Sequence, residues 1–157
     1  MATVVYPSEL FPALAGVSVD IPEGWVPLPE AGQLLALALP VAAGDFRPNV
    51  IVAVRRMVKG TALESTKQEL TARAASLTEY ASIGTEDRLV DGHPGYRMEG
   101  SFIHPQAGTL VQAIRLAVAD RGPVEDLVQI TGSVSGSQAL TLWPTIRAIQ
   151  DSLRILV

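Results

Sequence analysis

The sequence predicts an α+β domain in which an antiparallel sheet of about six or seven strands is flanked by two main α-helices. Two observations predict this fold. Strand-like runs follow one another along most of the chain and are joined by turn-rich loops, and two segments change to the spacing of an amphipathic helix. Helices segregated from sequential strands are typical of an antiparallel sheet with helices packed on it. The length suits one domain, which we expect to span 1–157.

Three runs before the first helix have the pattern of strands. VSVDIP (17–22) alternates apolar and polar residues and stops at a Pro-Glu-Gly turn. LLALALP (34–40) is short and apolar, and its leucines and alanines leave helix and strand nearly equal. Its length favours a strand. NVIVAVRRM (49–57) is rich in β-branched residues and is strongly strand-like.

The segment 62–77 is predicted to form an amphipathic helix that lays one stripe on the sheet. Three leucines lie seven residues apart on one face of such a helix: Leu63, Leu70 and Leu77. Thr61 is the expected N-cap, and Glu64, three residues later, would complete a capping box.

Four further strand-length runs are predicted to form an antiparallel meander: 80–90, 95–103, 109–119 and 127–135. Asp91-Gly92 supplies the positive φ angles that a tight two-residue hairpin turn requires. Both faces of 110–118 are mainly apolar, with Gln112 and Arg115 as the polar residues, so we expect a helix to cover each side of the sheet.

The last segment, 140–156, returns to helical spacing. Its apolar residues form one stripe: Leu142, Ile146, Ile149, Leu153 and Leu156. Pro144 is expected in the first turn of this helix, because in the interior it would remove a hydrogen bond and clash with the preceding turn.

The composition excludes several classes of function. The chain has no cysteine, which excludes thiol catalysis, disulfides and thiolate metal sites. The net charge is −4 and no basic cluster stands out, which argues against nucleic-acid binding. No apolar run approaches the roughly 20 residues that span a bilayer, and the first residues lack the pattern of a secretory signal. We therefore expect a cytoplasmic protein that does not insert into membranes.

No catalytic or metal-binding motif is complete. In TGSVSGS (131–137) the central position of a G-x-S-x-G elbow holds valine rather than serine. His93 and His104 lack metal-ligand spacing. The adjacent carboxylates, such as the pair Glu125-Asp126, lie beside turns where they point apart and would be solvated. We expect no catalytic residue, no metal, no cofactor and no enzymatic activity.

Polar residues within the strands suggest a binding surface instead. They could line one partly open face of the sheet: Arg55, Arg97, Glu99, Arg115 and Gln129. The alternative for each is a plain solvent-facing role. A second hypothesis places a small-molecule or lipid site with weak hydrolytic activity at Asp91, His93 and Tyr96.

Several segments, in this order, resemble the LpqN-type family of actinobacterial proteins within the PsbP-like superfamily: VSVDIPEGW (17–25), FRPNVIVAVRRMV (46–58), VDGHPGYRMEGSF (90–102), LVQAIRLAV (110–118) and LVQITGSVS (127–135). The resemblance runs from about residue 17 to the C-terminus. It implies an antiparallel sheet flanked by helices and carries no catalytic residues. The superfamily includes a Ran-binding import factor and is similar in fold to chaperones of type VI secretion effectors.

The resemblance implies a binding or scaffolding protein. LpqN-type members are typically exported lipoproteins anchored through a cysteine, and this chain has none. We therefore expect a non-enzymatic, cytosolic adaptor or chaperone with a protein partner and a role in secretion. The alternative is a small-molecule or lipid-binding protein linked to the cell envelope. A homodimer joined through an apolar sheet face is a third hypothesis.

Overall fold

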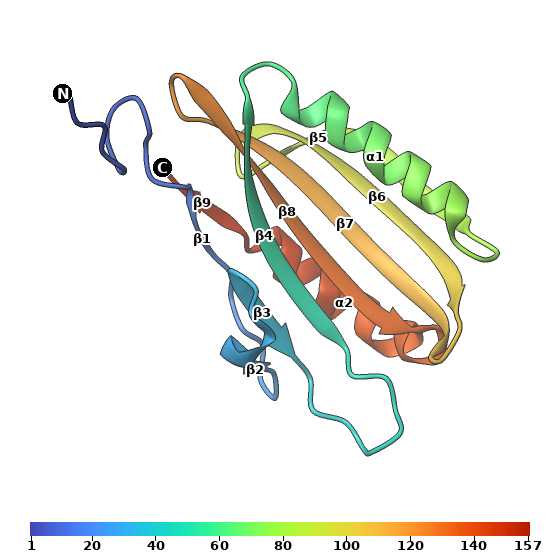
Figure 1. The fold of residues 1–157 in the computed structure, drawn as a ribbon. Helices are drawn as coiled ribbons and strands as arrows, with labels where there is room; N and C mark the ends of the chain where they lie inside the picture. The colour runs from blue at the N-terminus through green and yellow to red at the C-terminus, as the bar shows by residue number, and fades with distance from the viewer.

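The computed structural model describes residues 1–157 and has a seven-stranded antiparallel sheet in the order β2-β3-β4-β8-β7-β6-β5 (Figure 1). The α+β architecture predicted from the sequence is confirmed. The strands of this sheet are β2 (Val26–Pro27), β3 (Leu35–Ala38), β4 (Asn49–Val58), β5 (Ala81–Val90), β6 (His93–His104), β7 (Gly108–Asp120) and β8 (Val124–Ser135). A single 3-10 turn, η1 (Pro29–Ala31), lies between β2 and β3.

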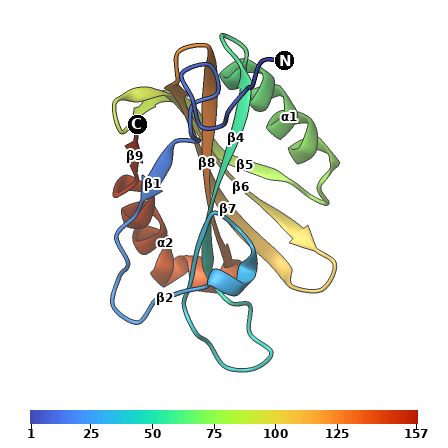
Figure 2. The ribbon, with the colours of Figure 1, turned by 60° about the vertical axis from the view of Figure 1, so that its left-hand side comes forward.

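The two helices cover opposite faces of this sheet, as Figures 1 and 2 show. Helix α1 (Ala62–Ser76) lies over β6, β7 and β8, and α2 (Gly136–Asp151) packs on the other face of β7 and β8. The central strand β7 contributes to both interfaces. Its Leu116 belongs to the apolar cluster under α1, and its Ala113 and Ala117 belong to the larger cluster under α2. Both faces of this strand are therefore apolar because, as predicted, a helix covers each side of the sheet.

Helix α2 begins four residues earlier than predicted. Ser135 accepts a hydrogen bond from the backbone N–H of Gln138 at 3.2 Å, and the Gln138 side chain accepts from the N–H of Ser135 at 2.9 Å. This reciprocal capping box fixes the first turn at Gly136. The apolar stripe alone could not show it, because the stripe begins only at Leu142.

The predicted position of Pro144 in the first turn of that helix is wrong, since Pro144 lies in its interior. Pro144 is exposed, and the residue whose carbonyl loses its partner, Leu140, is 87% exposed. Water can therefore satisfy that carbonyl on the outer side of α2.

The predicted capping box of α1 is also wrong. Thr61 makes no side-chain cap, and its hydroxyl donates instead to the carbonyl of Val58 at 2.6 Å. The cap comes from Glu125 at the start of β8, whose carboxylate accepts from the N–H groups of Gly60 at 2.7 Å and Ala62 at 2.9 Å. The N–H of Ala62 is one of those that a helix start leaves without an internal partner, and the N–H of Gly60 lies just before the helix.

The neighbouring carboxylate, Asp126, holds the N-terminal segment on the other face. It is fully buried and accepts from the N–H of Ala15 at 2.9 Å and from Arg56 at 3.0 and 3.2 Å. Glu125 and Asp126 do point apart, but the expectation that both are solvated is wrong. Each carboxylate ties a separate segment to the start of β8.

The first and last strands form a separate two-stranded sheet. The run predicted over 17–22 forms only β1 (Gly16–Ser18), which pairs with β9 (Arg154–Leu156) and not with the main sheet. Strand β9 replaces the end of the predicted C-terminal helix. The hairpin turn is as predicted, with φ of 49° at Asp91 and 77° at Gly92, and the Asp91 carboxylate accepts from the N–H of Ile155 at 2.8 Å.

Candidate binding site

The five residues predicted to share one binding face lie on two opposite faces. Arg55 faces α1, where it donates to Thr66 at 3.1 Å and to Glu69 at 3.0 Å. Gln129 lies opposite Leu116 and so also faces α1. The prediction of one shared face is therefore wrong, because it did not include the register between strands.

The other three predicted residues, Arg97, Glu99 and Arg115, share the face that carries α2. Arg97 and Arg115 are directly opposite each other on β6 and β7. Glu99 is on the same side of β6 as Arg97, two residues along, and it is fully buried. The structure thus brings these three predicted residues together.

The Glu99 carboxylate is the centre of this cluster. It accepts hydrogen bonds from Arg97 Nη1 at 2.8 Å and from Arg147 Nη2 at 2.7 Å and Nε at 3.2 Å. The two bonds from Arg147 form a side-on bidentate pair, the strongest geometry for a guanidinium and a carboxylate. The hydrogen bond to Glu99 raises the pKa of Arg147, so this arginine keeps its charge.

Strand β5 completes the cluster from the sheet edge. Arg97 Nε donates to Glu86 at 3.1 Å, and Arg88 Nη1 lies 3.6 Å from the same carboxylate. A β-bulge places Gly84 beneath the Arg97 guanidinium, where an added Cβ would come within 3.2 Å of Nη2. The glycine therefore leaves the space in which Arg97 lies.

Arg115 is the most buried arginine of the cluster, with 4% of its surface exposed. Its Nη1 pairs with the Asp151 carboxylate at the end of α2. Its Nε is buried and has no hydrogen-bond partner. An unpartnered buried guanidinium nitrogen is unusual, because buried polar groups are almost always satisfied.

These side chains surround a hollow of about 370 Å³, which we call the arginine hollow. It lies between α2 and strands β5, β6 and β7. Every lining residue is charged: Glu86, Arg88, Arg97, Arg115, Arg147 and Asp151. With Glu99 behind them, four guanidinium groups face three carboxylates, which leaves one positive charge uncompensated.

Sequence reasoning missed four members of the hollow. Glu86 and Arg88 were not assigned to a site, and Arg147 and Asp151 lie on α2, outside the strands that were searched. The sequence did contain a signal for Arg147 and Asp151, namely their spacing. They are four residues apart and therefore share one side of the helix, next to the apolar stripe that packs on the sheet.

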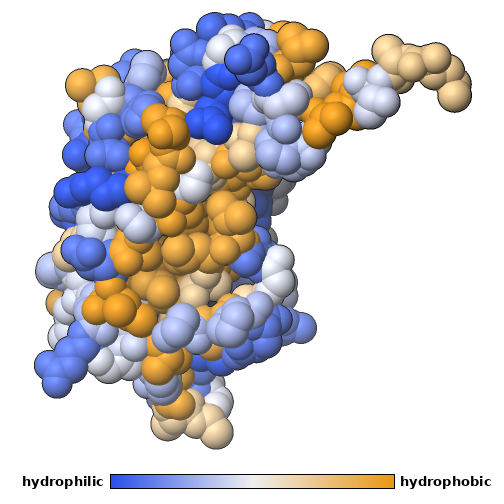
Figure 3. All heavy atoms as spheres, turned by 90° about the vertical axis from the view of Figure 1, so that its left-hand side faces the viewer, coloured by the Kyte–Doolittle hydropathy of each residue, from blue (hydrophilic) through white to orange (hydrophobic).

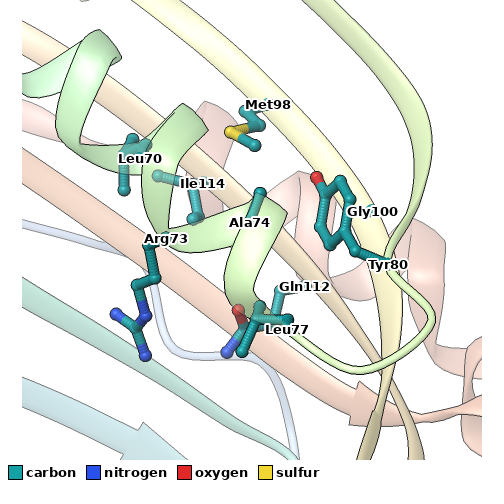
Figure 4. Close-up of a pocket in the computed structure, with 9 residues that line it drawn as sticks. All are labelled: Leu70, Arg73, Ala74, Leu77, Tyr80, Met98, Gly100, Gln112 and Ile114. Atoms are coloured by element: carbon teal, nitrogen blue, oxygen red, sulfur yellow. The ribbon is translucent and has the colours of Figure 1, made fainter.

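A smaller space lies under α1 (Figure 4). Its volume of about 20 Å³ is enough for about one water molecule. The ring of Tyr80 lies beside Gly100, where any added Cβ would collide with the ring. Burial raises the pKa of Tyr80. This space is a packing feature of α1 and is too small for an organic ligand.

A third hollow, of about 430 Å³, is mainly apolar and lies beside β2 and β3. The side of the molecule drawn in Figure 3 has an extensive hydrophobic surface. The apolar members of the lining include Val19, Ile21, Leu28 and Leu34. We call it the apolar hollow.

The second site predicted from the sequence does not assemble. Asp91 is bonded to Ile155 of β9. Tyr96 lies on the α1 face, with Lys67 Nζ 4.6 Å from its ring centre. His93 is three residues from Tyr96 on the same strand, so it points to the opposite face. The grouping of Asp91, His93 and Tyr96 was therefore wrong. No three His, Cys, Asp or Glu side chains lie together as a metal site.

Comparison with protein families gives a match over residues 7–156 to the family described as probable lipoprotein LpqN. The chain belongs to the LpqN family. The resemblance noted from the sequence is thereby confirmed. No curated protein matches the chain.

Solved structures share the fold of this LpqN family member. The crystal structure of LpqN from Mycobacterium tuberculosis, a protein involved in cell envelope biogenesis, has a TM-score of 0.78 at 14% identity, covering 93% of this chain and 86% of that one. Cyanobacterial PsbP from Synechocystis has a TM-score of 0.57 at 12% identity, covering 99% of this chain and 98% of that one. The Ran-binding protein Mog1p of Saccharomyces cerevisiae has a TM-score of 0.54 at 10% identity, covering 88% of this chain and 89% of that one. These similarities confirm the PsbP-like fold.

Neither helix of this LpqN family member is long and apolar enough to cross a membrane. The family's description as a lipoprotein does not clearly fit the cytoplasmic location predicted above, which stays a prediction. The similarity to type VI effector chaperones and the homodimer also stay predictions.

Proposed function

We propose that this LpqN family member is a non-enzymatic module that binds a segment of a partner protein at the arginine hollow. The observation that carries the proposal is the hollow itself, which is lined only by charged side chains. Small-molecule sites are mostly apolar with a few polar groups, whereas arginine is enriched at the energetic centres of protein interfaces. With its four arginines, the hollow has the chemistry of a protein interface.

The residues of the hollow also support a binding role over a catalytic one. They include no histidine, serine, threonine, tyrosine or lysine. Glu86, Glu99 and Asp151 each lie against an arginine, so no carboxylate stands free to act as a general base. Among proteins of similar fold, Mog1p is named for binding Ran, which supports a protein as the ligand here. Within this proposal, the chain acts as an adaptor or chaperone for a secreted protein.

The test is affinity capture from the native host under gentle conditions, followed by reconstitution with the purified partner. Arg88→Gln is the informative variant, because Arg88 lines the hollow and its nearest carboxylate lies 3.6 Å away. Arg73→Gln on the exposed surface of α1 is the matched control, since it makes the same charge change on the opposite face. We expect Arg88→Gln to weaken binding of the purified partner and Arg73→Gln to leave it unchanged. Equal binding by both variants would overturn the proposal.

A second candidate function has its own observation, the apolar hollow. Its volume of about 430 Å³ is within the range of small-ligand sites, and seven of its ten lining residues are hydrophobic. A lipid or another apolar small molecule in this hollow would suit an envelope-linked role. Titration with a fluorescent fatty acid tests this function: we expect saturable binding that Ile21→Asp abolishes. Ile21 is 47% exposed, so the substitution leaves the core intact.

A further inference from the structure

The free edge of Arg115 indicates what the arginine hollow recognises. In an arginine side chain, Nε and one Nη present two N–H groups in parallel, and this edge matches the two oxygens of a carboxylate. The structure gives Arg115 a single hydrogen-bond partner, Asp151, through Nη1. Nε is buried without a partner. The two-donor edge formed by Nε and Nη2 is therefore unoccupied by any protein acceptor.

The other charged groups of the hollow are already committed, with one exception. Glu99 accepts from Arg97 and Arg147, and Glu86 accepts from Arg97. Arg88 is the exception, because its only acidic neighbour lies 3.6 Å away and its side chain is 37% exposed. Arg97 and Arg147 each donate two hydrogen bonds to carboxylates, whereas buried Arg115 donates one and exposed Arg88 donates none.

The charge balance favours a ligand group with one negative charge. Four arginines and three carboxylates leave one positive charge uncompensated. Arg147 and Asp151 lie in the last turns of α2, where the helix dipole is negative and opposes a multiply charged anion. A phosphate monoester would bring more charge than the hollow can compensate, whereas a single carboxylate matches it.

We propose that the arginine hollow binds one carboxylate from an acidic side chain of a partner protein, held by the Nε and Nη2 groups of Arg115 with Arg88 beside it. This inference rests on the proposed protein-binding function and specifies the group that the partner supplies. It also accounts for the unpartnered Nε, which gains an acceptor in the complex.

The test follows the Arg115 Nε–H signal by NMR during titrations of the whole chain. Arg115→Lys assigns the signal and keeps the charge while removing the two-donor edge. The first probe is the capped peptide Ala-Ala-Glu-Ala-Ala, and its control carries Gln in place of Glu. Acetate and inorganic phosphate are the other two probes.

We expect a saturable downfield shift of the Nε–H signal with the Glu peptide and none with the Gln peptide. Arg115→Lys should weaken peptide binding, followed through backbone amide signals, about tenfold, because the bidentate geometry is lost. Arg88→Gln should weaken it about threefold, as expected for an exposed pair, while the Arg115 signal stays visible. That second variant keeps the test decisive if the first fails to fold.

Three results would overturn the inference. Tighter binding of phosphate than of the Glu peptide would reject a carboxylate, and acetate binding as tightly as the peptide would reject a protein source. If neither the Glu peptide nor acetate shifts the Arg115 Nε–H signal, water satisfies that group and the inference is rejected. If the Glu peptide fails while Arg88→Gln still weakens capture of the partner, the proposed function stands and only the carboxylate is rejected.

Discussion

Glu125 of β8 caps α1, although it lies 63 residues after Ala62 in the chain. Oε2 of Glu125 accepts a hydrogen bond from the N–H of Ala62 at 2.9 Å. The first helix is thus positioned on the sheet by a residue of β8 as well as by its own apolar stripe. The same carboxylate accepts from Gly60, so one side chain satisfies two N–H groups.

Replacement of this cap should destabilise the protein. We expect Glu125→Ala to lower the free energy of unfolding by about 2 kcal/mol, because loss of a cap leaves two N–H groups without an acceptor. Urea denaturation measures the change. Glu64→Ala is the control: Glu64 is exposed and the capping box predicted for it is absent, so its removal should cost less than about 0.5 kcal/mol. A larger loss for Glu64→Ala would contradict the assignment.

Neutralising Glu99, at the centre of the arginine hollow, should destabilise the fold more than neutralising Glu86 at its rim. Glu99 is fully buried, and Glu99→Gln removes the negative charge that lies between Arg97 and Arg147. We expect a loss of about 3 kcal/mol in unfolding free energy, the usual result of breaking a buried pair. Glu86→Gln at the half-exposed rim should cost no more than about 1 kcal/mol. Thermal and urea denaturation of both variants compare these losses, and equal losses would show that Glu99 is not the centre.

Gly132 permits close packing of α2 on β8, and a methyl group there should be destabilising. A Cβ at this position would collide with Cγ2 of Ile146, which is fully buried. We expect Gly132→Ala to lower the free energy of unfolding by about 2 kcal/mol through overpacking. In an Ile146→Ala background the same change should cost clearly less, because the colliding methyl group is gone. A double-mutant cycle in urea measures this coupling, and strictly additive effects would place the strain elsewhere.

Asp120 gives a pH-dependent contribution with a defined sign. The backbone N–H of Gly122 and then the ammonium group of Lys59 hold the pKa of Asp120 below its ordinary value of 3.8. A lowered folded-state pKa stabilises the protein above pH 3.8, and this contribution is lost as the pH falls through the lower folded value. Carbon NMR titration should place the midpoint below 3.8. In Lys59→Met it should rise but stay below 3.8, because the Gly122 bond remains; an unchanged midpoint would exclude Lys59 as a cause.

The sequence predicted the layers of the fold because they follow from periodicity. The two-sided apolar pattern around Arg115 required a helix on each face, and Asp91-Gly92 specified the hairpin. The capping box of α2 was also present in the sequence, as Ser135 and Gln138, but the apolar stripe drew the helix start to a later residue. Pro144 was misplaced because its solvent exposure, which makes an interior proline tolerable, depends on how the helix packs.

The candidate site was predicted only in part because it depends on distances between separate elements. Arg97, Glu99 and Arg115 were identified within their strands, but their common face depends on the strand register. Arg147 reaches Glu99 from 48 residues away, and only the packing of α2 brings the two together. Arg55 was included wrongly for the same reason, since nothing in its own strand indicates which helix it faces.

The pairing of β1 with β9 brings the two ends of the folded core side by side, with Gly16 opposite Leu156. A linker from Leu156 to the segment that precedes Ala13 would keep both this pair and the bond from the Ala15 N–H to Asp126. New ends could then be opened in the exposed loop between β3 and β4, around Gly44. The molecule is therefore a natural candidate for circular permutation, which would place new chain ends in the loop at Gly44.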